Sequence, residues 1–204
     1  MKILIATKNK GKIGSFGEIF DELNIEYCTL ADLNVGVGAL DIPETGKTSL
    51  ENAIIKAKAY YEATKMPLLA ADSALYIEKF PEDKQPGVFA KRYGGKENSD
   101  DETLEIYSKE LNNVGGESDG HFLVAIAIVD KDGNMHTKEF KSHRHFVSRP
   151  CAERIEHFPL RSLIYYKEVN KYMAQMTFEE SNAIEGQVIL DQKEFIKEIF
   201  LCTK

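Results

Sequence analysis

Residues 67–75 (Pro-Leu-Leu-Ala-Ala-Asp-Ser-Ala-Leu) constrain the fold more than any other stretch of the chain. A short apolar run that begins at a proline predicts a buried strand. This run delivers Asp72 and Ser73 to its own carboxyl end. In open α/β sheets, ligands bind beside the carboxyl ends of the strands. The stretch therefore predicts both a sheet and a polar site at its edge.

A basic turn near the start of the chain is expected at the same edge of the sheet. Residues 7–12 (Thr-Lys-Asn-Lys-Gly-Lys) follow an apolar run and precede apolar residues at helical spacing between Ile13 and Leu23. Free amides and the helix dipole at such a helix N-terminus favour an anion. The turn lacks the Gly-x-x-x-x-Gly-Lys-Ser/Thr pattern of a Walker A loop. On spacing alone, a solvated basic turn stays the alternative.

A third polar stretch, residues 44–53 (Glu-Thr-Gly-Lys-Thr-Ser-Leu-Glu-Asn-Ala), leads into a helix. Thr48 and Glu51 form a capping-box pattern at its start. Asn52 and Lys56 are four residues apart and share a face of that helix, although an exposed lysine is the alternative for Lys56. Together, the three stretches offer amides, lysines and carboxylates that suit a metal-bound polyphosphate.

The rest of the chain alternates helix and strand patterns. An amphipathic helix is predicted over 100–111, a polar linker over 112–119, and a hairpin of 122–130 and 135–147 around an Asp-Gly turn. A strand over 162–169 and a final amphipathic helix follow. Since hairpins and crossover helices both occur, the predicted fold class is α/β, with a long mixed sheet flanked by helices.

Length, charge and cysteine content exclude several classes of protein. The 204 residues suffice for one core, or for two lobes around one sheet. A net charge of -7 argues against a nucleic-acid partner. No apolar run approaches the ~20 residues of a membrane helix, so no membrane partner is expected. Cys28, Cys151 and Cys202 lack metal-ligand spacing and indicate reduced thiols, hence a cytoplasmic location.

Four motifs in order resemble the inosine triphosphate pyrophosphatase family, whose members cleave nonstandard purine triphosphates to the monophosphate and pyrophosphate. Residues 6–12 match Ala-Thr-x-Asn-x-x-Lys, and residues 44–56 match Glu-Thr-Gly-x-Thr followed by Glu-Asn-Ala and a lysine. Residues 70–75 are similar to Ala-Asp-Asp-Ser-Gly-Leu, and residues 86–93 to Pro-Gly-x-Tyr-Ser-Ala-Arg-Tyr.

The resemblance implies a role for each matched residue. Glu44 and Asp72 would hold Mg²⁺, with Mn²⁺ as an alternative ion, and Asp72 would also activate water. Lys12 and Lys56 would be catalytic and would stabilise the leaving pyrophosphate. The nucleoside triphosphate would be bound by Ser73, Arg92 and the turn of Thr7, Lys8, Asn9, Lys10, Gly11 and Lys12.

The resemblance also implies an architecture. Residues 1–204 would form a single domain with a cleft between two lobes, approximately 1–112 plus the C-terminal helix, and 113–176. By analogy with the family, a homodimer is expected.

Departures from the family's motifs leave the activity open. Ala71 replaces the first aspartate of the Asp-Asp pair and Ala74 replaces its glycine, and the base-recognition motifs of the last third are changed. The first hypothesis is an enzyme with altered or relaxed base preference. The alternative is a catalytically impaired relative that binds a nucleotide or a partner. A third hypothesis is a modified or non-purine substrate, with new contacts from Arg161, Ser162, Gln175, Glu185 and Gln187.

Overall fold

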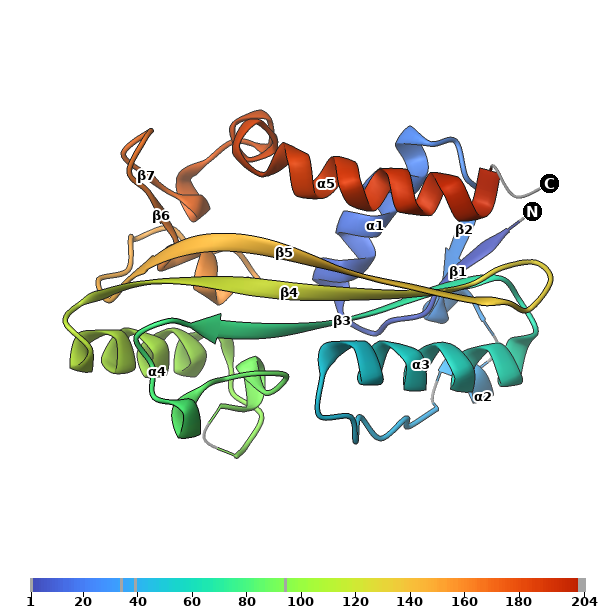
Figure 1. Cartoon of the computed structure of the whole chain (residues 1–204), viewed down its shortest axis with the longest axis horizontal. Coiled ribbons are helices and arrows are strands. Elements are labelled where there is room, and N and C mark those ends of the chain that lie inside the picture. The colour runs from blue at the N-terminus through green and yellow to red at the C-terminus, as the bar shows by residue number, and fades with distance from the viewer. Residues whose placement is uncertain (1, 34, 39, 94, 202–204) are drawn as a thin grey trace. The chain divides into compact units, whose positions relative to one another are not determined.

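A central five-stranded sheet organises the chain (Figure 1). The computed structural model describes residues 2–33, 35–38, 40–93 and 95–201. The strand order is β2-β1-β3-β4-β5, and β1 pairs in parallel with both β2 and β3. The strands β4 and β5 are joined by a tight turn in which Asp130 N donates to Asn134 O, so they form the predicted hairpin. The predicted mixed sheet is confirmed. The sheet strands are β1 (Ile3–Ile5), β2 (Tyr27–Thr29), β3 (Leu68–Ile77), β4 (Glu117–Val129) and β5 (Met135–Val147).

The helices begin where the sequence places their caps. Thr48 Oγ1 accepts from Glu51 N, and Ser99 Oγ accepts from Glu102 N, each within a capping box. Thr177 Oγ1 accepts from Glu180 N at the start of the last helix. The helices are α1 (Lys10–Glu22), α2 (Val35–Gly38), α3 (Ser49–Thr64), α4 (Asp100–Asn113) and α5 (Phe178–Leu201).

The chain divides into two compact units, and the first contains Met1–Ser73, Val124–Phe140 and Leu190–Lys204. On one face of its sheet, Leu68 and Ala70 of β3 pack with Ala53, Ala57 and Tyr60 of α3. On the other face lie α1 and the end of α5 (Figure 1), whose rings Phe20 and Phe200 are 6.0 Å apart between centroids. Because successive strand residues point to opposite faces, the apolar run of β3 fills both layers.

The second unit contains Ala74–Leu123 and Lys141–Ile189. Leu75 and Ile77, at the end of β3, pack in its core with Leu104, Tyr107 and Leu111 of α4. The predicted lobe boundaries stay a prediction.

Two local predictions differ from the structure. The strand predicted over 162–169 is too long: after a 3₁₀ turn (Pro159–Ser162), only Tyr165–Tyr166 forms a strand, β6, which pairs antiparallel with β7 (Lys171–Tyr172). The predicted linker over 112–119 is too long, because β4 already begins at Glu117. Glu117 and Asp119 are exposed while Ser118 and Gly120 are buried, which is the alternation of a strand with one solvated face.

The cysteines Cys28 and Cys151 are free and buried, whereas Cys202 lies outside the described residues. Over the part of the chain that the structure describes, no helix has both the length and the apolar character needed to cross a membrane.

Candidate functional site

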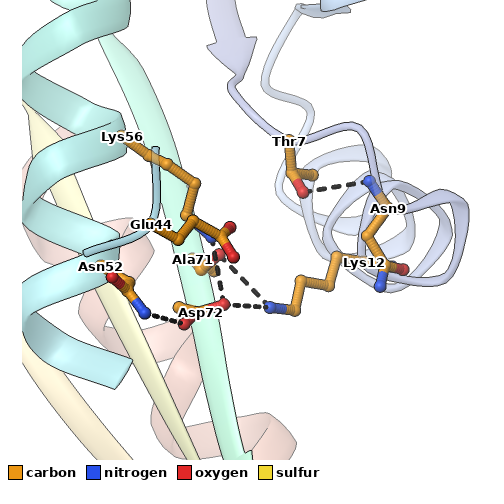
Figure 2. A network of polar contacts seen from close by, with 8 residues as sticks. All are labelled: Thr7, Asn9, Lys12, Glu44, Asn52, Lys56, Ala71 and Asp72. Carbon is orange, nitrogen blue, oxygen red and sulfur yellow. Dashed lines mark hydrogen bonds and ion pairs between the residues drawn. The ribbon is translucent and has the colours of Figure 1, made fainter. Parts of the chain in front are cut away.

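Asp72 is the centre of a buried polar network in the first unit (Figure 2). Leu68 and Ala70 face α3, and the two-residue period of β3 turns Asp72 toward the same helix. The residue is 8% exposed. Its Oδ1 accepts from Lys56 Nζ at 3.1 Å and from Lys12 Nζ at 3.4 Å, and its Oδ2 accepts from Asn52 Nδ2 at 3.2 Å. Three protein donors therefore compensate the burial of this carboxylate.

Lys56 joins the two predicted acidic residues. Its Nζ lies 3.0 Å from Glu44 Oε1 and 3.1 Å from Asp72 Oδ1, and the residue is 8% exposed. The capping box at Thr48 fixes where α3 begins, so Asn52 and Lys56, one turn apart, both reach Asp72. The reading of Lys56 as an ordinary exposed lysine is excluded.

The predicted phosphate turn caps α1. Asn9 is the N-cap, and its Oδ1 accepts from Lys12 N at 3.1 Å. Thr7 is buried at the end of β1, and its Oγ1 accepts from Asn9 N at 3.2 Å. These bonds hold the turn in shape and present the positive end of the helix dipole beside the Lys12 ammonium. Lys12 Nζ also donates to Ala71 O at 3.3 Å.

Burial and charge together shift the pKa values of Lys12 and Asp72. Burial lowers the pKa of the Lys12 ammonium from 10.5 to about 8, although the nearby Asp72 carboxylate opposes the shift. Burial alone would raise the pKa of Asp72, but the charges of Lys12 and Lys56 outweigh it and the pKa is lowered. Asp72 is therefore ionised at neutral pH, as a proton acceptor or a cation ligand must be.

The remaining predicted residues lie in and before the first turn of α1, on β3, and in the second unit. Lys8 and Lys10 are exposed, and Lys8 Nζ donates to Leu40 O at 2.8 Å, while Gly11 is buried in the first turn of α1. Ser73 is half-buried, and the alternation of β3 turns its side chain to the face opposite Asp72, as it does for Ala71. Arg92 belongs to the second unit, where its guanidinium lies 5.5 Å from the Phe89 ring centroid.

Ser162, Gln175 and Arg161, three of the residues proposed for a new substrate contact, have partners within the second unit. Ser162 is fully buried and its Oγ donates to Glu153 O at 2.6 Å. Gln175 Nε2 donates to Glu153 Oε2 at 3.1 Å, and Arg161 stacks on the Phe158 ring at 4.4 Å. The side chain of Glu185 lies outside the described residues. Ser162 is therefore excluded as a direct contact.

The sequence places Asn52 on the helix face of Lys56 without assigning it a role in the site. Its side chain is completely buried and touches both the Asp72 strand and the loop of Glu44, through Gly46. The signal was its position one turn before Lys56 on the same helix face, at a point where a core helix would carry an apolar residue.

The two carboxylates fit a hard divalent cation. Within the described ranges, no cluster of three or more His, Cys, Asp and Glu side chains is placed to hold a metal. Glu44 Oε1 and Asp72 Oδ1 nevertheless contact the same ammonium nitrogen, so both reach one cation position. Mg²⁺ is commonly bound by one or two carboxylates while phosphate and water oxygens complete its shell.

Comparison with known proteins gives consistent matches along the chain. Residues 3–187 match the model of the Ham1 family. A dITP/XTP pyrophosphatase from Halalkalibacterium halodurans is 32% identical over 182 residues, which cover 89% of this chain and 90% of that protein. One from Oceanobacillus iheyensis is 36% identical over 147 residues, or 71% and 73% of the two chains. The solved Ham1 protein of Staphylococcus aureus superposes with a TM-score of 0.75 at 25% identity, covering 97% and 98%.

Proposed function

Since the chain belongs to the Ham1 family, we propose that it hydrolyses a nucleoside triphosphate to the monophosphate and pyrophosphate. This membership confirms the resemblance predicted from the four motifs. The observation that carries the proposal is the buried Asp72 carboxylate, which contacts Lys12, Lys56 and Asn52. Because the relatives are named dITP/XTP pyrophosphatases, dITP and XTP are the first substrates to test.

The residues around Asp72 have the charges that such a hydrolysis requires. Water attacks the α-phosphorus, the bond from that phosphorus to the bridging oxygen breaks, and pyrophosphate leaves with the bond's electron pair. Asp72, ionised at neutral pH, orients the water and accepts its proton. Lys12 and Lys56 are point charges for the phosphoryl oxygens, and the N-terminus of α1 offers amides to the same anion.

Glu44 and Asp72 are the residues that would hold Mg²⁺, with Mn²⁺ as an alternative ion. Such an ion, when bound, neutralises negative charge on the phosphate oxygens. Thr7, Lys8, Asn9, Lys10, Gly11, Ser73 and Arg92 stay proposed contacts to the nucleotide.

The catalytically impaired alternative is not favoured. An impaired relative would be expected to lose the charged residues around the reacting phosphate, yet Lys12, Glu44, Lys56 and Asp72 are all present and in contact. The altered motifs of the last third support a changed base preference, since a site discriminates by the hydrogen bonds it offers. A homodimer in the cytoplasm completes the proposal, by analogy with the family.

Pyrophosphate release from a panel of triphosphates tests the function. With Mg²⁺ present, we expect turnover of at least one of dITP, XTP, ITP and the common nucleotides. Asp72→Asn should lower kcat by ~10³-fold or more, because a neutral amide cannot accept the proton. Folded wild-type protein that hydrolyses no nucleotide with Mg²⁺ or Mn²⁺ would refute the proposal. Light scattering during size-exclusion chromatography tests the homodimer.

A further inference from the structure

One buried amide joins the strand of Asp72 to the loop of Glu44. Asn52, the fourth residue of α3, is completely buried. Its Nδ2 donates to Asp72 Oδ2 at 3.2 Å (Figure 2). Its Oδ1 accepts from Gly46 N at 2.8 Å, two residues beyond Glu44. Both ends of the amide are therefore used, each on a different segment of the site.

We propose that Asn52 is a positioning residue, which fixes the plane of the Asp72 carboxylate and the place of the Glu44 loop so that both carboxylates face one cation position. The catalytic consequence rests on the proposed function. The contacts of Asn52 do not, and they can be tested separately.

The carboxylate needs such a restraint because its own torsion is soft. The terminal torsion of an aspartate is broad rather than confined to sharp staggered wells. Lys12 and Lys56 both donate to Oδ1, and each does so from the end of a flexible four-carbon stem. Asn52 has a short side chain on a regular helix and is the donor to Oδ2. It is therefore the stiffest of the three contacts that set the carboxylate plane.

Asparagine is the residue that the geometry requires at this position. The side chain must donate toward Asp72 and accept from Gly46 N, and only one orientation of the amide does both. Aspartate would place a second carboxylate beside Asp72 with no proton between them. Leucine, of similar size, would leave the Gly46 N–H without its acceptor and Asp72 Oδ2 without its donor.

The Glu44 loop is also pressed against Asn52. A Cβ at Gly46 would lie 2.7 Å from Asn52 Oδ1 and 2.9 Å from Asn52 N, closer than real Cβ atoms approach. The glycine thus allows the loop backbone to reach the amide, and the hydrogen bond holds it there.

The first test compares Asn52→Leu with a matched control, Ser49→Ala. Ser49 lies three residues earlier in α3, is 1% exposed, and its Oγ has no hydrogen-bond partner among the described residues. We expect Asn52→Leu to lower kcat by ~10–100-fold and to raise the half-saturating Mg²⁺ concentration by ~10-fold or more, as for residues that orient metal ligands. The KM for the nucleotide should change by less than about 3-fold, because phosphate contacts persist. Ser49→Ala should match the wild type.

The second test does not need activity. A double-mutant cycle of Asn52→Leu with Asp72→Ala is measured by urea unfolding. Because the two residues share a hydrogen bond, the shift of the double variant should be smaller than the sum of the single shifts. The cycle of Ser49→Ala with Asp72→Ala should be additive.

The outcomes separate the two proposals. An unchanged half-saturating Mg²⁺ concentration in folded Asn52→Leu, or an additive cycle with Asp72→Ala, would overturn the role of Asn52. A lower folded fraction alone would reduce kcat without changing the Mg²⁺ dependence. If Asn52→Leu does not fold, Asn52→Ser replaces it in both tests. If the wild type hydrolyses no nucleotide, the proposed function fails and the unfolding cycle alone decides the role of Asn52.

Discussion

The two ammonium groups that contact Asp72 differ in what surrounds them. Lys56 is held between two carboxylates, Glu44 and Asp72. Lys12 makes its ion pair with Asp72 and also donates to the carbonyl oxygen of Ala71. Burial lowers the pKa of Lys12 from 10.5 to about 8, although the carboxylates of Asp72 and Glu44 oppose the shift. Its charge can therefore be removed at a moderate pH.

We predict that kcat/KM falls as the pH rises through about 8, because the free enzyme then loses the Lys12 charge that binds phosphate. Well above pH 8, where only a small fraction of Lys12 is protonated, kcat/KM should fall by ~10-fold per pH unit. Lys12→Arg should move the fall to higher pH, since arginine stays protonated. Lys58→Arg, at an exposed position of α3, is the control and should keep the wild-type profile. A wild-type profile that is flat to pH 9.5 would contradict the prediction.

The same pKa has a consequence for stability. The folded value of Lys12, about 8, lies below its ordinary value of 10.5. Below about pH 8 the lysine is charged in both the folded and the unfolded state, so the cost of burying the charge is fully present. As the pH rises from about 8 to 10.5, the folded state releases the proton first and this cost is relieved.

The Glu44 loop and the first turn of α3 form one hydrogen-bonded element. Thr48 caps the helix, while the Glu51 side chain accepts from the backbone N–H groups of Lys47 and Thr48. Gly46 N donates to Asn52 in the same turn. Backbone N–H groups of the loop thus donate to side chains of the first helical turn, which gives this short segment a fixed conformation.

Gly46→Ala should disturb this element. The new Cβ would lie 2.7 Å from Glu51 Cβ and 2.7 Å from Asn52 Oδ1, so the loop must shift. We predict a loss of about 1–3 kcal/mol in the free energy of unfolding, measured by urea titration, and a fall in kcat of ~10-fold or more.

Gly14→Ala is the matched control for this substitution. Gly14 lies within α1, and no heavy atom of the described chain outside its own helix would lie within 4 Å of a Cβ there. Since alanine favours a helix by about 1 kcal/mol over glycine, the control should be slightly more stable. Equal effects of the two substitutions would mean that the Gly46 contact is unimportant.

The net charge of the chain bears on how strongly an anionic substrate is attracted to the protein. The chain carries a net charge of -7, and the four charges around Asp72 cancel, with Lys12 and Lys56 against Glu44 and Asp72. With its central charges balanced and the chain negative as a whole, the protein should steer an anionic substrate only weakly. We predict that kcat/KM at saturating Mg²⁺ changes by less than about 3-fold between ~0.05 and ~0.5 M KCl. A tenfold fall across this range would show that steering dominates.

Much of this fold follows from local signals. The capping box at Thr48, the Asp-Gly turn of the hairpin and the apolar run into Asp72 each act within a few residues, and the structure contains all of them. Period-2 alternation also explains why Asp72 faces α3. The contact of Lys12 with Asp72 follows from the rule that polar loops meet at the carboxyl ends of parallel strands.

The rest depends on distant partners. Asn52 bonds to Gly46 and to Asp72, 6 and 20 residues away, and its place one turn before Lys56 does not by itself identify these two partners. The start of β4 was missed because polar residues on its solvated face resemble a linker. The pair of β6 and β7 was missed because an apolar run of that length fits a strand or a turn packed on the core equally well.

Lys12, Asn52 and Lys56, which donate to Asp72, all precede residue 73 in the chain, yet the first unit is completed by Val124–Phe140 and by the part of α5 that begins at Leu190. A ribosome that has released the first 73 residues has therefore made this network and only part of the unit that holds it. A chain that ended before the last helical segment would still contain Lys12, Asn52, Lys56 and Asp72. It would lack the part of α5 that belongs to the unit in which these residues lie.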